Sequence, residues 1–306
     1  MVTRRQLLTL PLAMAALPRA LRAAPQGTAS KMSFGYAAIT WGANLTQAMD
    51  DIAAVGFKAI QLRIEAFQQF GDKPAALKEE LQKRGLTFAV LSSGNLSIDP
   101  AREETDIAAH VAHAKFAKAA GCEYLQIIDE RPKGRTLGAD DYKRVGKLLS
   151  TIGQRTAEIG VPVVYHHHLN SVGERPAEVD AVLDAAEPRY VKMLFDVAHF
   201  QQAGGDPVSA IRKYASRIKV VHLKDVKTTN GNASPTGGGS PGNYQFVELG
   251  NGRVDLAGVF TALAAIKYDS WAIVELDRVP DPERTPKDCA EINKRFIADR
   301  GFRIAD

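Results

Sequence analysis

The sequence predicts an α/β protein with one domain, a (β/α)8 TIM barrel that follows an export signal. Eight short apolar segments alternate with eight amphipathic segments along 306 residues, a pattern typical of a parallel sheet covered by helices. Eight such units indicate a closed barrel, because about five or six would indicate an open doubly wound sheet. No GxGxxG motif follows the first expected strand, so the sequence does not indicate dinucleotide binding.

An export signal is expected at residues 1–24. Residues 3–8, TRRQLL, resemble the twin-arginine motif, and small residues suitable for a signal peptidase precede position 25. The apolar segment 7–17 is shorter than the roughly 20 residues of a membrane-spanning helix. A twin-arginine signal would direct the protein to the periplasm without a stable membrane anchor. The alternative is a segment that is retained as an amphipathic N-terminal anchor.

Removal of the expected signal changes the charge of the protein. Residues 1–24 contain four arginines and no acidic residue, so cleavage would lower the formal net charge from +4 to 0. A neutral domain is poorly suited to the phosphate backbone of nucleic acid, which we do not expect as a partner. The two cysteines, Cys122 and Cys289, are expected to be buried apolar residues that do not form a disulfide. The sequence does not determine the oligomeric state, and a homo-oligomer is one of the options.

The expected catalytic domain covers residues 31–306, and its strands are the segments rich in Val, Ile, Leu and aromatic residues. These segments are 34–40, 57–63, 86–92, 122–128, 161–167, 190–196, 218–224 and 271–277. Amphipathic patterns between them predict helices at 45–55, 75–84, 103–120, 140–159, 176–186, 207–216, 256–266 and 286–299. Glycine ends several of these helices, as at Gly56 and Gly160. Segment 226–252, rich in Gly, Ser and Asn, is expected to be a long loop, either a functional lid or a disordered insertion.

Polar residues at the ends of the last four strands predict a metal site, because active sites of such barrels lie at the C-terminal ends of the strands. Side-chain alternation would place His166, Asp196, His222 and Glu275 on one inward face. Each residue alone could be a cap or a rim residue, but four successive strand ends are harder to explain in this way. Imidazole and carboxylate ligands together favour one divalent ion, with Mn, Co, Zn or Fe preferred over Mg.

Several motifs resemble the sugar-phosphate isomerase/epimerase superfamily of xylose-isomerase-like barrels, over roughly residues 34–278. The motifs are GYAAITWG, FDVAH, VVHLKDV and LGNGRVDLAGVFTALAAIKYDSWAIVELDR. The resemblance implies metal ligands from the last four strands, three of which match Asp196, His222 and Glu275, and it implies that His199 contacts substrate. Epimerases have a glutamate where this chain has His166. The segment YHHHLNSVGE is instead similar to the inosose dehydratase branch.

The fourth metal ligand stays open between His166, His168 and Glu174. Glu174 could complete the metal shell, or it could be an acidic residue near the start of the helix that opens at Pro176. Histidines can act as acid or base, so His166 and His168 join Glu275 as catalytic candidates. Lys224 is a further catalytic candidate, either with a lowered pKa beside the metal or as a donor to an oxyanion. An ion pair of Lys224 with Asp225 or Asp196 is the alternative.

The predicted activity is proton abstraction α to a carbonyl of a carbohydrate, assisted by one divalent metal ion. Loss of a β-oxygen would make the protein a lyase, and reprotonation would make it an isomerase or epimerase; we favour the lyase. Export favours an unphosphorylated keto-sugar, keto-glycoside or inosose. Trp41 and Tyr36 could stack on a sugar or belong to the core, and Arg278 is a third substrate-binding candidate beside Trp41 and His199. A metal-dependent apurinic endonuclease and a non-catalytic sugar-binding module or partner subunit are the remaining alternatives.

Overall fold

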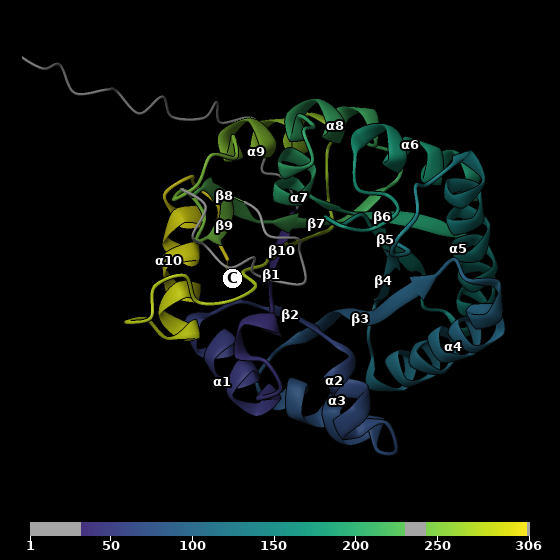
Figure 1. Ribbon diagram of the computed structural model, residues 1–306. Helices are drawn as coiled ribbons and strands as arrows, with labels where there is room; N and C mark the ends of the chain where they lie inside the picture. The colour runs from purple at the N-terminus through teal and green to yellow at the C-terminus, as the bar shows by residue number, and fades with distance from the viewer. Residues whose placement is uncertain (1–31, 230–242, 305–306) are drawn as a thin grey trace, which may run out of the picture.

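The computed structural model describes residues 32–229 and 243–304, which form a closed barrel of eight parallel strands surrounded by helices (Figure 1). The hydrogen-bonded order around the barrel is β1-β10-β7-β6-β5-β4-β3-β2. The barrel strands are β1 (Ser33–Ala37), β2 (Ala59–Leu62), β3 (Thr87–Ser97), β4 (Tyr124–Glu130), β5 (Val163–His166), β6 (Val191–Asp196), β7 (Ile218–Leu223) and β10 (Trp271–Val274). The predicted (β/α)8 fold is therefore confirmed.

The helices follow the strands in the expected order, with two additions. They are α1 (Leu45–Val55), α2 (Ile64–Phe70), α3 (Pro74–Lys83), α4 (Glu103–Ala120), α5 (Ala139–Ile159), α6 (Pro176–Ala185), α7 (Val197–Gln202), α8 (Pro207–Lys213), α9 (Leu256–Ala265) and α10 (Pro286–Ala298). The short helices α2 and α7 were not predicted, because fewer than two turns carry little periodicity. Gly56 and Gly160 end α1 and α5 with backbone φ angles of 104° and 84°, which residues other than glycine rarely adopt.

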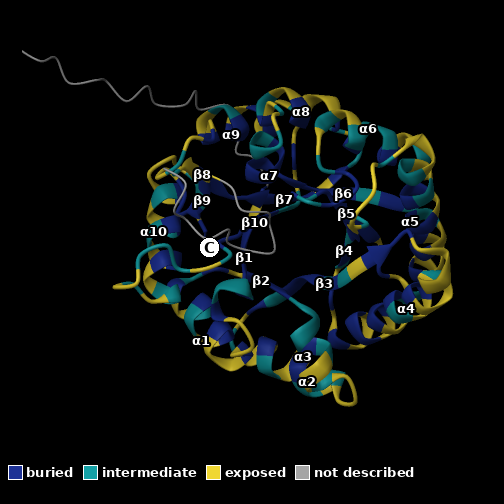
Figure 2. Cartoon of the chain, in the orientation of Figure 1, coloured by how far each residue is buried: buried dark blue, intermediate teal, exposed yellow. Residues whose placement is uncertain are grey.

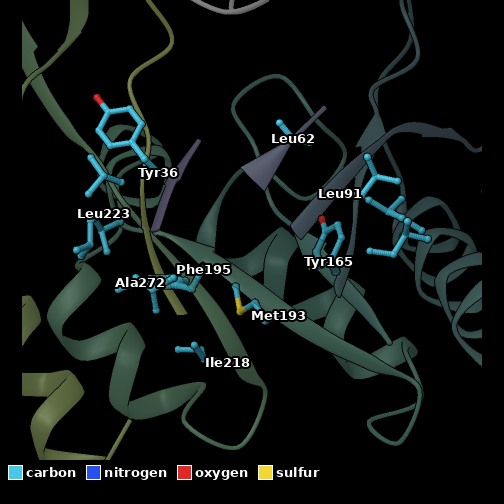
Figure 3. Packing of buried hydrophobic residues seen from close by; sticks show 14 of the residues in the cluster. Tyr36, Leu62, Leu91, Tyr165, Met193, Phe195, Ile218, Leu223 and Ala272 are labelled. Atoms are coloured by element: carbon cyan, nitrogen blue, oxygen red, sulfur yellow. The ribbon is translucent and has the colours of Figure 1, made fainter. Parts of the chain in front are cut away.

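The core has two layers, one inside the barrel and one between the barrel and the helices. Small and branched residues fill the inner layer: Ala37, Ala59, Ala89, Val90, Val164, Leu194, Val220 and Ile273. The outer layer is larger and contains aromatic residues such as Tyr36, Tyr165 and Phe195 (Figure 3). The strands are consequently buried, whereas the outward faces of the helices are exposed (Figure 2). Burial on both faces explains why the strand segments are almost continuously apolar.

The expectation that 226–252 is entirely a loop is wrong, because two parts of this segment form an antiparallel pair of strands. These strands are β8 (Asp225–Thr228) and β9 (Tyr244–Val247), with Asp225 opposite Val247 and Thr228 opposite Tyr244. The Gly, Ser and Asn content of the whole segment concealed two short β-prone runs, whose apolar residues Val226, Tyr244 and Phe246 are buried. Residues 230–242 between them lie outside the described residues.

Three further expectations concern the chain outside the barrel strands. The expected signal at residues 1–24 lies outside the described residues, so export and periplasmic location stay predictions. None of the helices within 32–229 and 243–304 is long and apolar enough to cross a membrane. Cys122 and Cys289 are both buried and free, which confirms their expected role as small core residues.

Candidate metal centre

Four residues converge at the carboxyl ends of neighbouring strands. His166 ends β5, Asp196 ends β6, His222 lies on β7, and Glu275 directly follows β10. One potential ligand atom of each residue lies within 4.8 Å of the others, and all four residues are buried. Parallel register accounts for the convergence, because Asp196 lies opposite His222 in the β6–β7 pair. The structure thus brings together the four residues that side-chain alternation placed on one face.

Three of these residues carry a buried polar atom that has no hydrogen-bond partner among the described residues. The Asp196 Oδ1 atom accepts from the backbone N–H groups of Ala198 and His199 at 2.9 and 2.8 Å, whereas its Oδ2 makes no hydrogen bond and lies 3.4 Å from His222 Nδ1. His166 Nδ1 and His222 Nδ1 make no hydrogen bond either. Leaving each such atom unsatisfied costs about 1–3 kcal/mol. Two imidazoles and two carboxylates that meet in this way form a donor set that fits a divalent transition metal.

The charges of the cluster are strongly coupled to one another. Burial alone would lower the pKa of His222, but Glu275 and Asp196 together raise it to about 9. The Nδ1 atom of His222 lies 3.4 Å from Asp196 Oδ2 and 3.4 Å from Glu275 Oε1. The pKa of His166 is lowered, first by burial and then by the neighbouring His222. His166 is therefore neutral at physiological pH and has a lone pair available for a metal.

Lys224 is fully buried beside the cluster, and its ammonium group is paired. Its Nζ lies 2.9 Å from Glu275 Oε1, donates to Asp277, and lies 3.3 Å from His199 Nε2. The same nitrogen lies 4.1 Å from the ring centroid of Phe246 on β9, a cation–π distance. Burial alone would lower the pKa of Lys224, but Asp277 and Glu275 outweigh it and raise the pKa. Lys224 is therefore a hydrogen-bond donor at neutral pH.

The lowered pKa was expected for Lys224 beside a bound metal ion and stays a prediction, whereas Asp277 and Glu275 on their own raise the pKa. The alternative of an ion pair with Asp225 or Asp196 is wrong, because Lys224 pairs with Glu275 and Asp277. Asp225 instead accepts four backbone hydrogen bonds: Val226 at 2.9 Å, Gly250 at 2.9 Å, Gly252 at 3.0 Å and Val254 at 3.0 Å. Asp225 thereby fixes the segment that follows β9.

The three consecutive histidines divide between two sides of β5. His166 and His168 group with His199, with one ring nitrogen of each within 4.8 Å of the others. The rings of His168 and His199 lie 3.8 Å apart between centroids, and His168 Nδ1 lies 2.7 Å from the carbonyl oxygen of Leu169. His167 points the other way, where its Nε2 accepts from the backbone N–H of Asp196 at 3.2 Å. The alternation expected for this segment is therefore observed.

Glu174 does not join the metal-ligating group. Its carboxylate lies 3.5 Å from Arg131 Nη2, and Arg131 also contacts Glu178 at 3.2 Å. Glu178 in turn closes a capping box at the start of α6. Of the three candidates for the fourth ligand, the structure thus places only His166 with Asp196, His222 and Glu275.

Among the described residues, neither Trp41 nor Arg278 makes a side-chain hydrogen bond to the four converging residues. The Trp41 indole N–H donates to Asp51 at 2.8 Å, and its ring packs on Tyr36 at 5.7 Å. Tyr36 is fully buried, and its hydroxyl accepts from Asn293 at 2.9 Å. Arg278 follows β10 and is exposed. The third candidate, His199, does lie within the site.

The structure adds polar residues that the sequence interpretation did not select. Gln61 on β2 and Gln126 on β4 point into the barrel beneath the cluster, and Gln61 contacts His222 at 2.9 Å. A glutamine within the apolar strands AIQL and YLQII was the available signal. Phe246 was also missed, because its proximity to Lys224 depends on the geometry of the β8–β9 hairpin. Asp277 was expected on the same face as Glu275 but was not selected as a site residue.

Comparison with known proteins agrees with this architecture. The profile of the xylose isomerase-like TIM barrel family matches residues 49–295. The chain is 29% identical over 254 residues to the inosose dehydratase of Lacticaseibacillus casei, a match that covers 76% of this chain and 82% of that protein. The matched profile spans most of the chain, so it indicates the family to which the chain belongs.

Solved structures share the fold at low sequence identity. The IolI protein with a bound zinc atom has a TM-score of 0.74 and 18% identity, covering 88% of this chain and 98% of that one. The probable 3-DHS dehydratase AsbF of Bacillus anthracis has a TM-score of 0.69 and 16% identity, covering 87% and 99%. With the family profile, the closed barrel and the four converging strand ends taken together, this chain belongs to the xylose isomerase-like TIM barrel family.

Proposed function

We propose that this protein is a divalent-metal-dependent dehydratase of an unphosphorylated keto-sugar, keto-glycoside or inosose. Its relatives include an inosose dehydratase and a probable 3-DHS dehydratase, and this chain is a sugar-modifying enzyme. The observation that carries the metal dependence is the buried convergence of His166, Asp196, His222 and Glu275, with three ligand atoms that make no hydrogen bond. A purely structural cluster would satisfy these atoms with hydrogen bonds.

The four converging residues would hold the ion. When bound, a divalent cation supplies Lewis acidity that stabilises negative charge on a carbonyl oxygen. The mixed imidazole and carboxylate donors favour Mn, Co, Zn or Fe over Mg. The zinc atom bound by the structurally similar IolI protein is consistent with this choice.

His168 is the residue that we assign to proton transfer. Its Nδ1–H donates to the Leu169 carbonyl at 2.7 Å, which leaves the lone pair on Nε2. His168 is partly exposed and lies beside His166 and His199, so a substrate can reach it. His166 is neutral but belongs to the ligand set. His168 Nε2 therefore takes the proton from the carbon next to the carbonyl.

Lys224 assists the reaction by donating a hydrogen bond to the oxygen on which negative charge develops. Glu275 and Asp277 hold its ammonium group in place and keep it protonated. In the elimination, the C–H electron pair forms a C=C bond and the β C–O bond breaks with its own electron pair. The departing hydroxyl takes a proton from the His168 imidazolium and leaves as water. The unsaturated ketone that remains carries a hydroxyl on its α-carbon, so it is an enol and tautomerises to a diketone.

Elimination is favoured over epimerisation by the composition of the site. An imidazole that has taken the α-proton can return it to a leaving hydroxyl. The dehydratase names of the relatives support the same choice. Lys224, the cation beside the cluster, is already paired with two carboxylates, which disfavours a phosphorylated substrate. Residues 1–24 support the further proposal that the enzyme acts in the periplasm.

The test begins with metal analysis of the purified protein and of the His222→Ala variant. His110→Ala is the matched control, because His110 is also a buried histidine but lies on α4. We expect about one equivalent of a transition metal in wild type and control, and its loss in His222→Ala. Keto-sugars and inososes are then incubated in D2O with the loaded enzyme. Loss of water supports the dehydratase, whereas an isomer of unchanged composition that contains solvent deuterium would support an epimerase. No metal in wild type would overturn both.

A further inference from the structure

A chain of buried and partly buried side-chain hydrogen bonds runs beneath the proposed metal site from one wall of the barrel to the other. His222 Nε2 lies 2.9 Å from Gln61 Oε1, Gln61 Nε2 donates to Gln126 Oε1 at 2.7 Å, and Gln126 Nε2 donates to Ser92 Oγ at 3.2 Å. We call the hydrogen-bonded side chains of Gln61, Gln126 and Ser92 the relay. His222 lies on β7 and Gln61 on β2, which are separated by β10 and β1, so their contact crosses the barrel interior.

The direction of these hydrogen bonds determines which nitrogen of His222 carries a proton. Because the Gln61 amide nitrogen is used toward Gln126, its carbonyl oxygen faces His222. A carbonyl oxygen only accepts, so His222 Nε2 carries the hydrogen. The lone pair of a neutral His222 is then on Nδ1, which lies 3.4 Å from oxygens of both Asp196 and Glu275. A proton on Nδ1 would face these two carboxylates, and a metal ion bound between them would take the place of that proton.

The position of the relay also needs an explanation. Gln61 and Gln126 are 1% and 3% exposed, directly above a layer of small apolar residues inside the barrel. Burial of amide groups stabilises a core less than burial of apolar groups of similar size. Two adjacent glutamines inside the barrel are therefore better explained by what they do to His222 than by packing.

We propose that Gln61 is a positioning residue that holds His222 as the Nε2–H tautomer, with Nδ1 directed to the metal, and that Gln126 fixes the Gln61 amide in the required orientation. This inference rests on the metal site of the proposed function. A hydrogen bond from the second ring nitrogen of a ligating histidine sets both its tautomer and its orientation, and its loss typically weakens metal affinity by about 10–100-fold.

The test is the affinity of four variants for Zn2+, measured by competition with a chromophoric chelator. Gln61→Leu removes the acceptor at similar size, whereas Gln61→Glu keeps an oxygen acceptor toward His222. Gln126→Leu leaves the Gln61 amide free to rotate. Gln69→Leu is the matched control, since Gln69 is exposed on α2 and contacts only the Ala43 carbonyl among the hydrogen bonds of its side chain described here.

We expect Gln61→Leu to bind Zn2+ about 10–100-fold more weakly than wild type, Gln126→Leu to be intermediate, and Gln61→Glu and Gln69→Leu to stay close to wild type. Wild-type affinity in Gln61→Leu would overturn the inference. So would equal weakening in Gln61→Leu and Gln61→Glu, which would indicate a packing role. If Gln61→Leu does not fold, weaker binding of Zn2+ by Gln126→Leu than by Gln61→Glu would support the inference, and equal affinities of these two variants would overturn it.

Histidine-selective 15N NMR of the zinc-loaded protein provides a second measurement that does not depend on activity. We expect His222 to show a hydrogen-bonded Nε2–H that is protected from exchange in wild type and loses this protection in Gln61→Leu. A proton on Nδ1 with zinc on Nε2 would overturn the inference. The outcome is distinct from failure of the proposed function, in which wild type itself would bind no zinc.

Discussion

The ammonium group of Lys224 and the carboxylate of Glu275 form an ion pair of 2.9 Å in which the lysine is fully buried. Asp277 pairs with the same nitrogen, so one cation balances two buried carboxylates next to the proposed metal. Loss of the lysine would leave two negative charges without that partner in a low-dielectric site. The pair therefore contributes both to the stability of the barrel and to the charge balance of the active site.

Replacement of Lys224 by methionine tests this relationship. We expect the free energy of unfolding to fall by about 3–5 kcal/mol, and kcat to fall by at least about 100-fold because a donor to the developing oxyanion is lost. Urea unfolding and steady-state kinetics measure the two effects. Lys227→Met is the control, because Lys227 is exposed on β8. A Lys224→Met protein with wild-type kcat would remove Lys224 from the mechanism.

Asp225 provides a second prediction, because its two carboxylate oxygens accept from four backbone N–H groups. Asp225→Asn turns one oxygen into an NH2 group that faces two of these donors. We expect a loss of about 3 kcal/mol in unfolding free energy and faster hydrogen exchange in residues 249–254. Asp255→Asn is the matched control, because the exposed Asp255 carboxylate caps α9 through Gly258. Equal effects of the two substitutions would contradict the organising role of Asp225.

The positions of the four proposed ligands at the strand ends could be predicted from sequence because they depend on local properties. Alternation along one strand decides which side chains face inward, and parallel strands of a closed barrel place their carboxyl ends together. His166, Asp196, His222 and Glu275 are therefore recoverable from the expected strand boundaries.

Other features depend on contacts between segments that are distant in sequence. Glu174 lies in a loop whose course is set in part by Arg131, 43 residues earlier, so spacing could not separate it from His168. The β8–β9 pair forms across a segment whose average composition resembles a loop. The contact between Gln61 and His222 joins residues 161 positions apart. Such contacts follow from barrel closure, which strand periodicity alone does not specify in side-chain detail.

The separation of Glu174 from the cluster leads to a prediction about metal content. Because its carboxylate faces Arg131 at 3.5 Å, Glu174→Gln should retain about one equivalent of metal, whereas Glu275→Gln should lose most of it. Both substitutions remove one negative charge at nearly constant size, so each serves as the control for the other. Elemental analysis after dialysis against a chelator measures the difference. Metal loss in Glu174→Gln alone would identify Glu174 as a ligand that approaches on metal binding.

His110 leads to a prediction about stability in acid, at a distance from the proposed metal site. It lies on α4 and its Nδ1 is 2.7 Å from Ser93 Oγ. Burial first, and then the neighbouring His113, lower its pKa from 6.5 to about 4. Folded His110 thus stays neutral between about pH 6.5 and 4, whereas the unfolded chain binds a proton there. The free energy of unfolding must therefore fall as the pH decreases through this interval.

The His110→Gln variant isolates this contribution, because glutamine keeps a polar group near Ser93 but does not titrate. A pKa shift from 6.5 to about 4 corresponds to about 3 kcal/mol at pH 4. We expect the unfolding free energy of wild type to fall more steeply with acid than that of the variant, by roughly this amount in total. Urea titrations at several pH values measure both curves, with Lys115→Gln on the exposed face of α4 as the control. Parallel curves for wild type and His110→Gln would mean that His110 binds its proton equally in the folded and unfolded states, against its burial.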